Sequence, residues 1–490
     1  MILPVSARML ETPTGLEVEV TLETYESLLA AITVKDGEGR EVFNPATGEL
    51  IGRVPVQTVA DVDAAIARAK AAQPAWAALS DEERVGYLNK VADAIEANAE
   101  PLAELLSREQ GKPLNGPNAR FEVGGCVAWT RVPANTPLPV DVVIDDGENY
   151  AEMHYRPLGV VGAITPWNWP MMIAIWQVVP ALRMGNTVVQ KPSEYTTLSG
   201  LALNHVINSV LPEGVLNTVV GAGDLGGHLV ASDDIAKIMF TGSTRTGKKI
   251  IESSSGNIKR LTLELGGNDA GIVLDDVDPK EIAEGLFWGA FINTGQTCAA
   301  LKRLYVPESI YDEVVDALAE FAKQMPMGPG LDENNVLGPL QNEMQFKVVD
   351  GLVKAAKESG ARVVMGGDPD YDAPGNFYPT TLIADIDPQN PLVVEEQFGP
   401  ALPIIKYTDL EEVIKLANDL EVGLGASVWS KDREKARAIA ARIQAGTVWI
   451  NAHGMVNPFI PFGGAKQSGY GQEFGVEGLK AVAQPQVING

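Results

Sequence analysis

Cysteine and histidine are scarce in this sequence. Its 490 residues include only two cysteines and four histidines, namely Cys126, Cys298, His154, His205, His228 and His453. Two cysteines exclude a disulfide framework and leave too few thiolates for a cysteine-based zinc site. Because the histidines also show no metal-binding spacing such as H-E-x-x-H, we expect no metal centre.

Basic residues are few compared with acidic ones. The chain has 38 Lys and Arg against 64 Asp and Glu, a formal net charge of −26. A negative charge of this size repels phosphate backbones and anionic lipid, so we expect neither nucleic acid nor a membrane as a partner. Solubility alone also explains the charge.

Long uncharged runs are nearly missing. The one such run, Pro157 to Leu182, contains four prolines as well as Asn168 and Gln177, which excludes a single membrane-spanning helix. We expect a strand, a loop and a buried helix there. The first residues, MILPVSARMLETPTGLEVEV, turn acidic too early for a signal peptide, so we expect a cytoplasmic protein.

Short apolar runs that alternate with helical patterns predict an α/β fold. The runs VVGAI, NTVVQ, VLNTVV and KIMFTG are typical of buried parallel strands and predict a doubly wound sheet between 155 and 265. A helix over 61–79 and a capping box at Ser80–Glu83 precede this sheet. A second α/β unit is predicted beyond Gly266, with helices over 280–292, 309–324 and 341–359.

Cys298 follows a turn in the segment FINTGQTCAALKRLYV. A thiol on a glycine-bounded loop that faces backbone amides can have a lowered pKa and act as a nucleophile. The alternative for any cysteine is a buried, inert side chain, and Cys126, within a helical pattern, is expected to be one. The polar turn residues favour a functional Cys298.

Glu264, in LTLELGGND, is the best candidate for a base beside this thiol. Leu261, Leu263 and Leu265 occupy one strand face, so Thr262 and Glu264 share the other. A glutamate at the carboxyl end of a strand faces the crevice where α/β sheets bind ligands. A solvated strand residue is the alternative.

Two glycine patterns compete as a dinucleotide site. Residues 221–226, GAGDLG, match G-x-G-x-x-G literally, but no acidic residue follows at the end of the next strand. That strand ends in FTGSTRTG, residues 240–247, and continues into a helix whose N-terminal amides can bind a pyrophosphate. Plain turns explain either pattern.

Nine motifs occur in one order from Phe43 to the C-terminal region. They are FNPATGE, TPWNWP, GNTVVQKPSE, FTGSTRTG, LELGGND, NTGQTC, EEQFGP, GTVWIN and PFGGAKQSGYG. In this order the chain resembles the NAD(P)-dependent aldehyde dehydrogenase superfamily over nearly its whole length. The resemblance implies oxidation of an aldehyde to a carboxylic acid with NAD, or alternatively NADP.

The resemblance also implies the catalytic residues. Cys298 is the expected nucleophile, Glu264 the general base, and Asn168 the side chain that joins the Cys298 backbone N–H in an oxyanion hole. Thiolate attack on the aldehyde would give a thiohemiacetal, and loss of hydride would leave a thioester. Water activated by Glu264 would then hydrolyse the thioester.

Cofactor contacts are implied in the same way. Lys191 and Glu194 correspond to contacts with the adenosine ribose, Glu396 to the nicotinamide ribose, and Phe398 to a wall of the nicotinamide pocket. The complete expected set is Thr165, Pro166, Trp167, Lys191, Glu194, Gly223, Phe240, Gly242, Ser243, Thr246, Gly247, Leu265, Gln345, Glu396 and Phe398. A charged Glu194 would oppose a 2′-phosphate, so we expect a preference for NAD.

The implied fold has two doubly wound α/β domains and a small β element for oligomerisation. We predict a dinucleotide-binding domain over 1–134 and 155–263, and a catalytic domain over 264–463. Residues 135–154 and 464–490 would form strands that pair between subunits of a homodimer or homotetramer, or a local hairpin. Residues 1–40 lack the short strand-forming opening common in the family.

The substrate is expected to be an uncharged aliphatic or aromatic aldehyde. The predicted tunnel residues are Trp169, Ile173, Trp176, Asn451 and Phe459, with Phe462 nearby. Their mostly apolar surfaces would favour such substrates by ~25 cal/mol per Å² buried. A semialdehyde carboxylate would need a cation in the tunnel. Arg303 is the nearest one, but its role in the family is general. Ordinary core positions are the alternative for Trp176 and Phe462.

Two other functions fit the same resemblance. A CoA-acylating semialdehyde dehydrogenase is disfavoured, because members of that group generally lack the glutamate at the position of Glu264. A catalytically silent structural protein of this fold is disfavoured because Cys298, Glu264, Asn168 and Glu396 are all retained.

Overall fold

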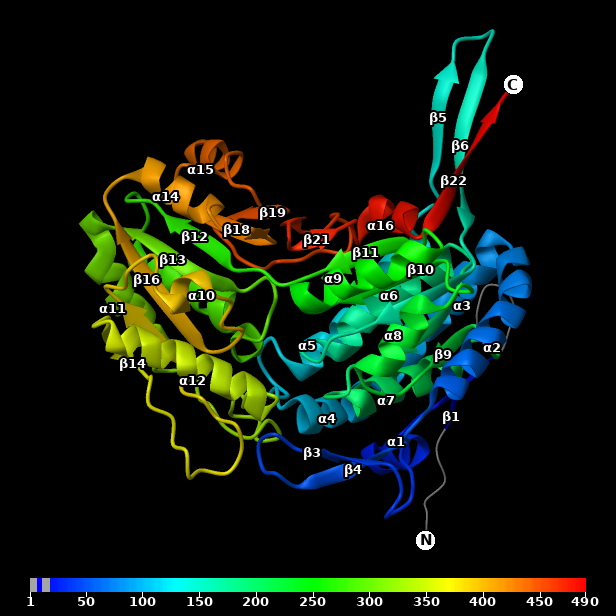
Figure 1. Ribbon diagram of the computed structural model, residues 1–490, viewed down its shortest axis with the longest axis horizontal. Helices are drawn as coiled ribbons and strands as arrows, with labels where there is room; N and C mark the ends of the chain where they lie inside the picture. The colour runs from blue at the N-terminus through cyan, green and yellow to red at the C-terminus, as the bar shows by residue number, and fades with distance from the viewer. Residues whose placement is uncertain (1–6, 11–17) are drawn as a thin grey trace.

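Two large sheets, each surrounded by helices, form the two lobes of the protein. A computed structural model describes residues 7–10 and 18–490. One lobe contains the helices α2 to α9, and the other contains α10 to α15 (Figure 1). A third, narrow sheet projects away from both lobes.

The first sheet has the strand order β21-β11-β10-β7-β8-β9. Its strands are β7 (Val160–Ile164), β8 (Thr187–Lys191), β9 (Leu216–Thr218), β10 (Lys237–Thr241), β11 (Arg260–Glu264) and β21 (Gly469–Tyr470). All are parallel except β21, which is antiparallel to β11. Every residue of β8 and β10 is buried, as expected for a parallel sheet covered on both faces. The doubly wound sheet is confirmed, although β9 covers only part of VLNTVV.

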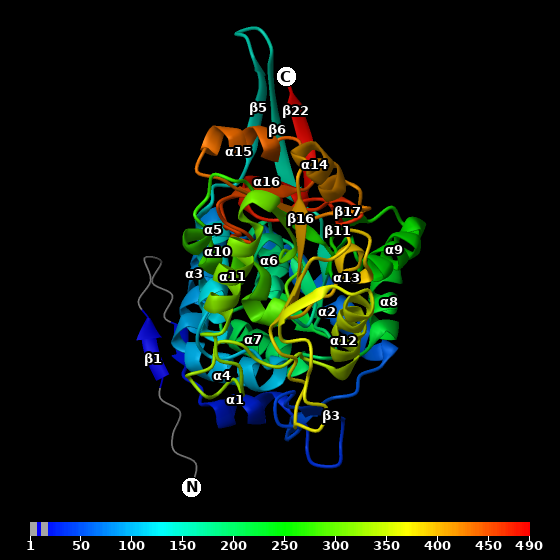
Figure 2. The same ribbon diagram turned by 90° about the vertical axis from the view of Figure 1, so that its left-hand side faces the viewer.

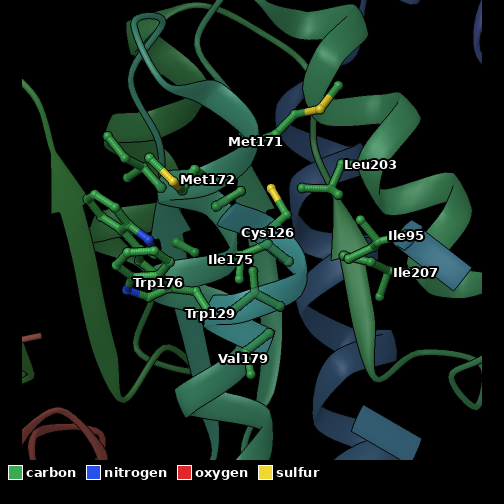
Figure 3. Close-up of a cluster of buried hydrophobic side chains, with 14 of the residues drawn as sticks. Ile95, Cys126, Trp129, Met171, Met172, Ile175, Trp176, Val179, Leu203 and Ile207 are labelled. Atoms are coloured by element: carbon green, nitrogen blue, oxygen red, sulfur yellow. The ribbon is translucent and has the colours of Figure 1, made fainter. Parts of the chain in front are cut away.

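Helices cover both faces of this sheet. They are α2 (Val59–Ala78), α3 (Asp81–Ala97), α4 (Ala99–Gln110), α5 (Ala119–Asn135), α6 (Pro170–Arg183), α7 (Thr197–Asn208), α8 (Gly223–Ala231) and α9 (Thr244–Ser253). Successive strand residues point to opposite faces, so Val188 joins the core under α3 to α7 while Val189 joins the core under α2 and α8. Figure 3 shows part of the first core, around Cys126, which is buried in α5 as predicted.

Local signals explain two of these boundaries. The capping box at the start of α3 is present, since Ser80 Oγ accepts from the Glu83 N–H at 3.2 Å and the Glu83 carboxylate accepts from the Ser80 N–H at 2.8 Å. The uncharged segment from Pro157 divides into β7, a loop and the buried helix α6, as predicted. Within the described residues, no helix has the length and apolar character needed to cross a membrane.

The second sheet has the order β14-β15-β16-β13-β12-β18-β19. Its strands are β12 (Asp269–Val273), β13 (Leu301–Pro307), β14 (Arg362–Met365), β15 (Thr381–Ala384), β16 (Ala401–Tyr407), β18 (Gly425–Trp429) and β19 (Thr447–Ile450). Around it lie α10 (Pro279–Phe291), α11 (Tyr311–Ala322), α12 (Glu343–Glu358), α13 (Pro391–Val394), α14 (Leu410–Asn418) and α15 (Arg433–Ala440). Only β14 is antiparallel to its neighbour among these described strands. The predicted second α/β unit is therefore present.

The projecting sheet consists of β5 (Val140–Asp145), β6 (Tyr150–Pro157) and β22 (Ala483–Asn489). β5 and β6 form the local hairpin, and β22 pairs with β6 in antiparallel register from Ala483 to Asn489. Figures 1 and 2 both show this sheet standing clear of the lobes. Its exposed apolar side chains include Val142, Val143, Ile144, Val487 and Ile488.

Small elements complete the chain. They are β1 (Ala7–Leu10), β2 (Val18–Thr21), α1 (Tyr25–Ile32), β3 (Arg40–Phe43), β4 (Leu50–Val54), β17 (Val422–Gly423), β20 (Ala465–Lys466), α16 (Gly475–Ala481), and the 3₁₀ turns η1 (Ser254–Gly256), η2 (Ile292–Gly295) and η3 (Glu308–Ile310). The expectation that 1–40 lacks short strands is wrong, because β1 pairs with β2 through backbone hydrogen bonds that need no side-chain signal. The rest of that arm, 1–6 and 11–17, lies outside the described residues.

The predicted domain boundaries stay a prediction. The tail 464–490 contributes more than the oligomerisation strand, because β20 pairs with β17 and β21 extends the first sheet.

The carboxyl ends of the parallel strands in the first sheet meet at one edge. Thr241 lies level with Glu264, and Ile164 lies level with Lys191. The loops that follow these strands therefore start side by side, and the candidate site is built from them.

Candidate active site

Cys298 lies on a tightly turned segment after α10. Asn293, Thr294 and Gly295 all have left-handed backbone angles, with φ of 50°, 56° and 75°. A Cβ atom on Gly295 would lie 2.3 Å from the Gly399 carbonyl oxygen, so only glycine fits there. This turn leaves the Cys298 side chain partly exposed.

The loop between β7 and α6 brings Asn168 to the cysteine segment. The Asn168 side-chain amide donates to the Gln296 carbonyl at 3.0 Å, and the Asn293 side chain donates to the Asn168 carbonyl at 2.8 Å. Trp169 Nε1 also donates to Thr297 Oγ1 at 3.0 Å. Within the described residues the Cys298 amide N–H has no backbone acceptor. Asn168 thus contacts the cysteine segment, and the Cys298 N–H is a second donor in that segment.

Glu264 is a buried carboxylate, not a solvated strand residue. Its side chain is 4% exposed, and neither oxygen has a hydrogen-bond partner within the described chain. Burial raises the pKa of Glu264 well above its usual range, and the nearby Glu473 carboxylate raises it further. Glu473 is buried as well, and burial raises its pKa to about 8. Carboxyl groups in this environment can hold and release a proton near neutral pH.

The expectation of a lowered thiol pKa is wrong for this structure. Burial raises the pKa of Cys298 to about 12, opposed by the Lys302 ammonium and reinforced by the carboxylates of Glu264, Glu396 and Asp269. The amides of the turn do not offset these effects. This environment therefore favours the protonated thiol, and Glu264 is one of the carboxylates that contribute to the effect.

Lys302 connects the cysteine segment with Glu396. Its ammonium lies 3.1 Å from Glu396 Oε1 and also donates to the Cys298 carbonyl. The Gly267 N–H donates to the same carboxylate at 3.2 Å, and a Cβ on Gly266 would lie 2.5 Å from Glu396 Oε2. Gly266 and Gly267, which follow Leu265 at the end of β11, thus make room for Glu396 at the site.

The two residues that follow Glu396 contact other segments of the chain. The rings of Phe398 and Trp167 meet edge-on with centroids 5.4 Å apart. Gln345, at the start of α12, donates to the Gln397 carbonyl at 2.8 Å. These contacts join three predicted cofactor residues from separate segments into one group.

The other predicted cofactor residues lie at the carboxyl edge of the first sheet. The Thr165 N–H donates to the Lys191 carbonyl at 3.1 Å, and the buried Lys191 ammonium lies 3.9 Å from Glu194 Oε2. An ammonium beside a half-exposed carboxylate offers the donors and acceptors that ribose hydroxyls need. The remaining members of this group are Pro166, Gly223, Phe240, Gly242, Ser243, Thr246, Gly247 and Leu265.

Helix α9 begins at this edge and points its N-terminus toward it. Ser243 Oγ accepts from the Thr246 N–H at 3.3 Å, which caps the helix. A Cβ on Gly247 would lie 2.7 Å from the Leu265 side chain, so the glycine lets α9 pack closely onto the end of β11. The first amides of α9 and its dipole form a site for an anion such as a pyrophosphate.

Comparison with known proteins identifies this arrangement. Residues 32–488 match the model of the family described as "Aldehyde dehydrogenase family". The chain belongs to the aldehyde dehydrogenase family. It is 39% identical over 457 residues to phenylacetaldehyde dehydrogenase of Pseudomonas fluorescens, with 90% of each chain covered.

Solved structures of aldehyde dehydrogenases and related enzymes share the fold. An NAD⁺ complex of aldehyde dehydrogenase from Bacillus cereus superposes with a TM-score of 0.88 at 35% identity, covering 94% of each chain. An NADP-dependent enzyme from E. coli gives a TM-score of 0.89 at 34% identity, covering 94% of this chain and 96% of that one. The protein is thus an NAD(P)-dependent oxidoreductase that acts on an aldehyde, as predicted, and the alternative of a silent structural protein is set aside.

The predicted tunnel residues of this aldehyde dehydrogenase occupy different environments. Trp169 and Ile173 are buried beside the Asn168 loop, whereas Phe459 is 69% exposed. The Asn451 side chain both donates to and accepts from the Ser430 backbone, at 2.8 Å each.

Trp176 belongs to a buried aromatic cluster. Its ring lies 5.7 Å from Trp129 and 4.7 Å from Phe474, and the Phe462 ring stacks on Phe474 at 5.9 Å. Figure 3 shows Trp176 and Trp129 side by side within the core around Cys126. The core interpretation, left open for Trp176 and Phe462, fits these contacts.

Sequence reasoning missed several charged residues of the site. They are Lys302, Glu473, Lys237, Lys112 and Glu122. Each of these residues is buried, and its charged partner is distant in the sequence or belongs to another element. The one available signal was the position of Lys302, four residues after the predicted nucleophile.

Proposed function

We propose that this aldehyde dehydrogenase oxidises an uncharged aliphatic or aromatic aldehyde through a thioester on Cys298. The observation that carries the proposal is the convergence of a cysteine, an amide donor and an unpaired buried carboxylate from three separate segments. Asn168 bonds to the Cys298 segment, and Glu264 influences the Cys298 pKa directly. These are the residue types that acyl transfer through a thiol requires.

In the first half of the reaction, Cys298 attacks the aldehyde carbon. The thiol proton passes to solvent water as the S–C bond forms, and the negative charge moves onto the aldehyde oxygen. The Asn168 amide and the Cys298 N–H then donate to that oxygen, which stabilises it most when its charge is greatest. When bound, NAD accepts the hydride that the aldehyde carbon releases. A thioester on Cys298 remains.

In the second half, Glu264 removes a proton from water while the water oxygen attacks the thioester carbon. The C–S bond breaks, the carboxylic acid leaves, and the Cys298 sulfur takes the proton that Glu264 removed from water. Glu264 suits this step because its two oxygens have no other partner within the described chain. Glu473 supports this step as a second buried carboxyl group with which Glu264 can share a proton.

The cofactor role rests on the edge of the first sheet. Lys191 and Glu194 would hold the adenosine ribose, the N-terminus of α9 the pyrophosphate, and Glu396 the nicotinamide ribose. We propose a preference for NAD, because the Glu194 carboxylate would repel a 2′-phosphate. When the nicotinamide ribose binds, its hydroxyls would replace the Lys302 ammonium as the partner of the Glu396 carboxylate.

The substrate class rests on the lack of a free cation beside Trp169 among residues 7–10 and 18–490. Lys112 lies over the Trp169 ring, but its ammonium is completely buried and bonded to Glu122 and the Asn168 carbonyl. It therefore does not serve a substrate carboxylate. Phe121, which meets Trp169 edge-on, is 48% exposed and offers an apolar surface at this point. The phenylacetaldehyde specificity named for the Pseudomonas relative also supports an aromatic substrate.

A coupled set of assays tests the proposal. We expect NADH formation with hexanal, benzaldehyde and phenylacetaldehyde, no requirement for coenzyme A, and a lower kcat/KM for succinate semialdehyde. We expect Cys298→Ala to lose turnover while NAD binding and the melting temperature stay near wild type. A clear preference for the semialdehyde would contradict the proposed substrate class. A requirement for coenzyme A would contradict the hydrolytic mechanism. Residual turnover of Cys298→Ala would contradict the role of Cys298 as the nucleophile.

We also propose that the sheet of β5, β6 and β22 pairs subunits in a homodimer or homotetramer. Its exposed Val142, Val143 and Ile144 support this, because a projecting sheet with apolar side chains gains by covering them. Val142→Asp should dissociate the oligomer in light scattering, and an unchanged mass would contradict the proposal. A cytoplasmic location also stays a prediction.

A further inference from the structure

A completely buried ion pair lies behind the Asn168 loop. Lys112 follows α4, Glu122 is on α5, and the side chains of both are 0% exposed. The Lys112 ammonium lies 2.6 Å from Glu122 Oε2. Neither Lys112 nor Glu122 is among the predicted site residues.

Lys112 holds the backbone of the oxyanion residue. Its ammonium donates to the Asn168 carbonyl at 2.7 Å and lies 3.6 Å from the centre of the Trp169 ring. Its three protons thus face a carboxylate, a carbonyl and an aromatic face, which accounts for all of them. The same Asn168 carbonyl accepts from Asn293, so two donors fix its orientation.

Glu122 holds the helix that follows. Its second oxygen, Oε1, accepts from the N–H groups of Met171 at 2.9 Å and Met172 at 3.1 Å. These amides belong to the first turn of α6, where N–H groups have no partner within the helix. A carboxylate at a helix N-terminus also interacts favourably with the helix dipole. The pair therefore bonds to the chain on both sides of the turn at Asn168 and Trp169.

A buried pair of this kind is a costly way to stabilise a core. Burying two charges often contributes no more than well-packed apolar residues of similar volume would. Its directional bonds, however, restrict the backbone at Asn168 in a way that apolar packing does not. A displacement of about 1 Å in a catalytic group is enough to slow a reaction about 100-fold.

We propose that Lys112 and Glu122 are positioning residues for the oxyanion hole, because they fix the Asn168 backbone and the start of α6 so that the Asn168 amide faces the Cys298 segment. The inference rests on the proposed role of Asn168. Neither residue touches the reacting atoms, and both act through Asn168.

The test is the rate of NADH formation in a single turnover, with enzyme in excess over aldehyde and saturating NAD. We expect Asn168→Ala to be slowed about 100-fold or more, as for other oxyanion donors. Lys112→Met should be slowed about tenfold or more, with an unchanged Kd for NAD. In the Asn168→Ala background, Lys112→Met should cost less than about a further twofold, because the residue through which it acts is already lost.

Two further variants separate positioning from general stability. Glu122→Gln keeps the side-chain shape and should slow the single turnover in the same way, with the same small further loss in the Asn168→Ala background. This variant also tests the proposal if Lys112→Met does not fold. Arg183→Met is the matched control, since Arg183 is a buried cation at the other end of α6, paired with Asp81. It should lower the melting temperature without slowing the single turnover.

Multiplicative losses in the double variants would overturn the positioning role. So would a single-turnover rate of Arg183→Met that falls as far as that of Glu122→Gln. A wild-type rate for Asn168→Ala alone would instead overturn the oxyanion role of Asn168, and the inference with it.

Discussion

Replacing Glu264 by glutamine should separate the two halves of the reaction. The carboxylate is 4% exposed and has no hydrogen-bond partner in the described part of the chain, so glutamine, of nearly the same shape, fits without breaking a described contact. It removes only the ability to accept a proton. The Cys298 proton passes to solvent during the first half and hydride release transfers no proton, so only the attack by water depends on that ability.

The size of the effect follows from this placement. A positioned general base contributes about 10²–10⁴-fold to its step. Loss of that factor corresponds to about 3–5 kcal/mol on the barrier of thioester hydrolysis. Glutamine also carries no charge that would raise the Cys298 pKa, so the first half should not slow.

Rapid mixing with benzaldehyde and NAD, followed at the NADH absorbance, measures both halves at once. Glu264→Gln should release about one NADH per active site at the wild-type rate and then turn over about 10²–10⁴ times more slowly. Loss of the initial burst would contradict this division of the reaction, because it would give Glu264 a role before hydride transfer. Steady turnover near wild type would show that another base acts on water.

The remaining predictions concern the charge, burial or pKa of individual residues. Because Glu194 opposes a 2′-phosphate, Glu194→Gln should raise the kcat/KM ratio of NADP to NAD several-fold, and an unchanged ratio would place Glu194 away from the ribose. Trp176→Ala should destabilise the protein by about 3–5 kcal/mol and Phe459→Ala by less than about 0.5 kcal/mol in thermal melts, and equal losses would contradict their burial. The ionised form of Glu264 is the base and burial raises its pKa, so thioester hydrolysis should accelerate as the pH rises through a range well above the usual one for a glutamate. Glu473→Gln should move that rise to lower pH, and an unmoved profile would show that the two carboxyl groups are not coupled.

Local signals predicted much of the fold. Short Val- and Ile-rich runs gave the buried strands of the first sheet, and the capping box gave the start of α3. The predicted amide donor and base follow or end the parallel strands β7 and β11, whose carboxyl ends lie at one edge of the first sheet. The nucleophile comes from the segment before β13 of the second sheet. The β5–β6 hairpin was among the stated alternatives, although its pairing with β22 joins segments more than 300 residues apart, and no local pattern encodes this.

The electrostatics of the site could not be predicted in the same way. The Cys298 pKa depends on Lys302, Glu264, Glu396 and Asp269, whose distances only the folded chain sets. Lys112 and Glu122 show the same limit. In the sequence they are an ordinary helix-flanking lysine and a helix glutamate, and burial alone turns them into an ion pair behind Asn168.

The most direct test of the account is to locate the covalent intermediate. Glu264→Gln should be mixed with NAD and benzaldehyde, quenched in acid, digested, and its peptides weighed by mass spectrometry. The chain has only two cysteines, and Cys126 is completely buried in α5, so it serves as an internal control. The thioester mechanism predicts a benzoyl group on the Cys298 peptide in nearly every molecule and none on the Cys126 peptide. An unmodified Cys298 after NADH has formed, or an acyl group on another residue, would contradict it.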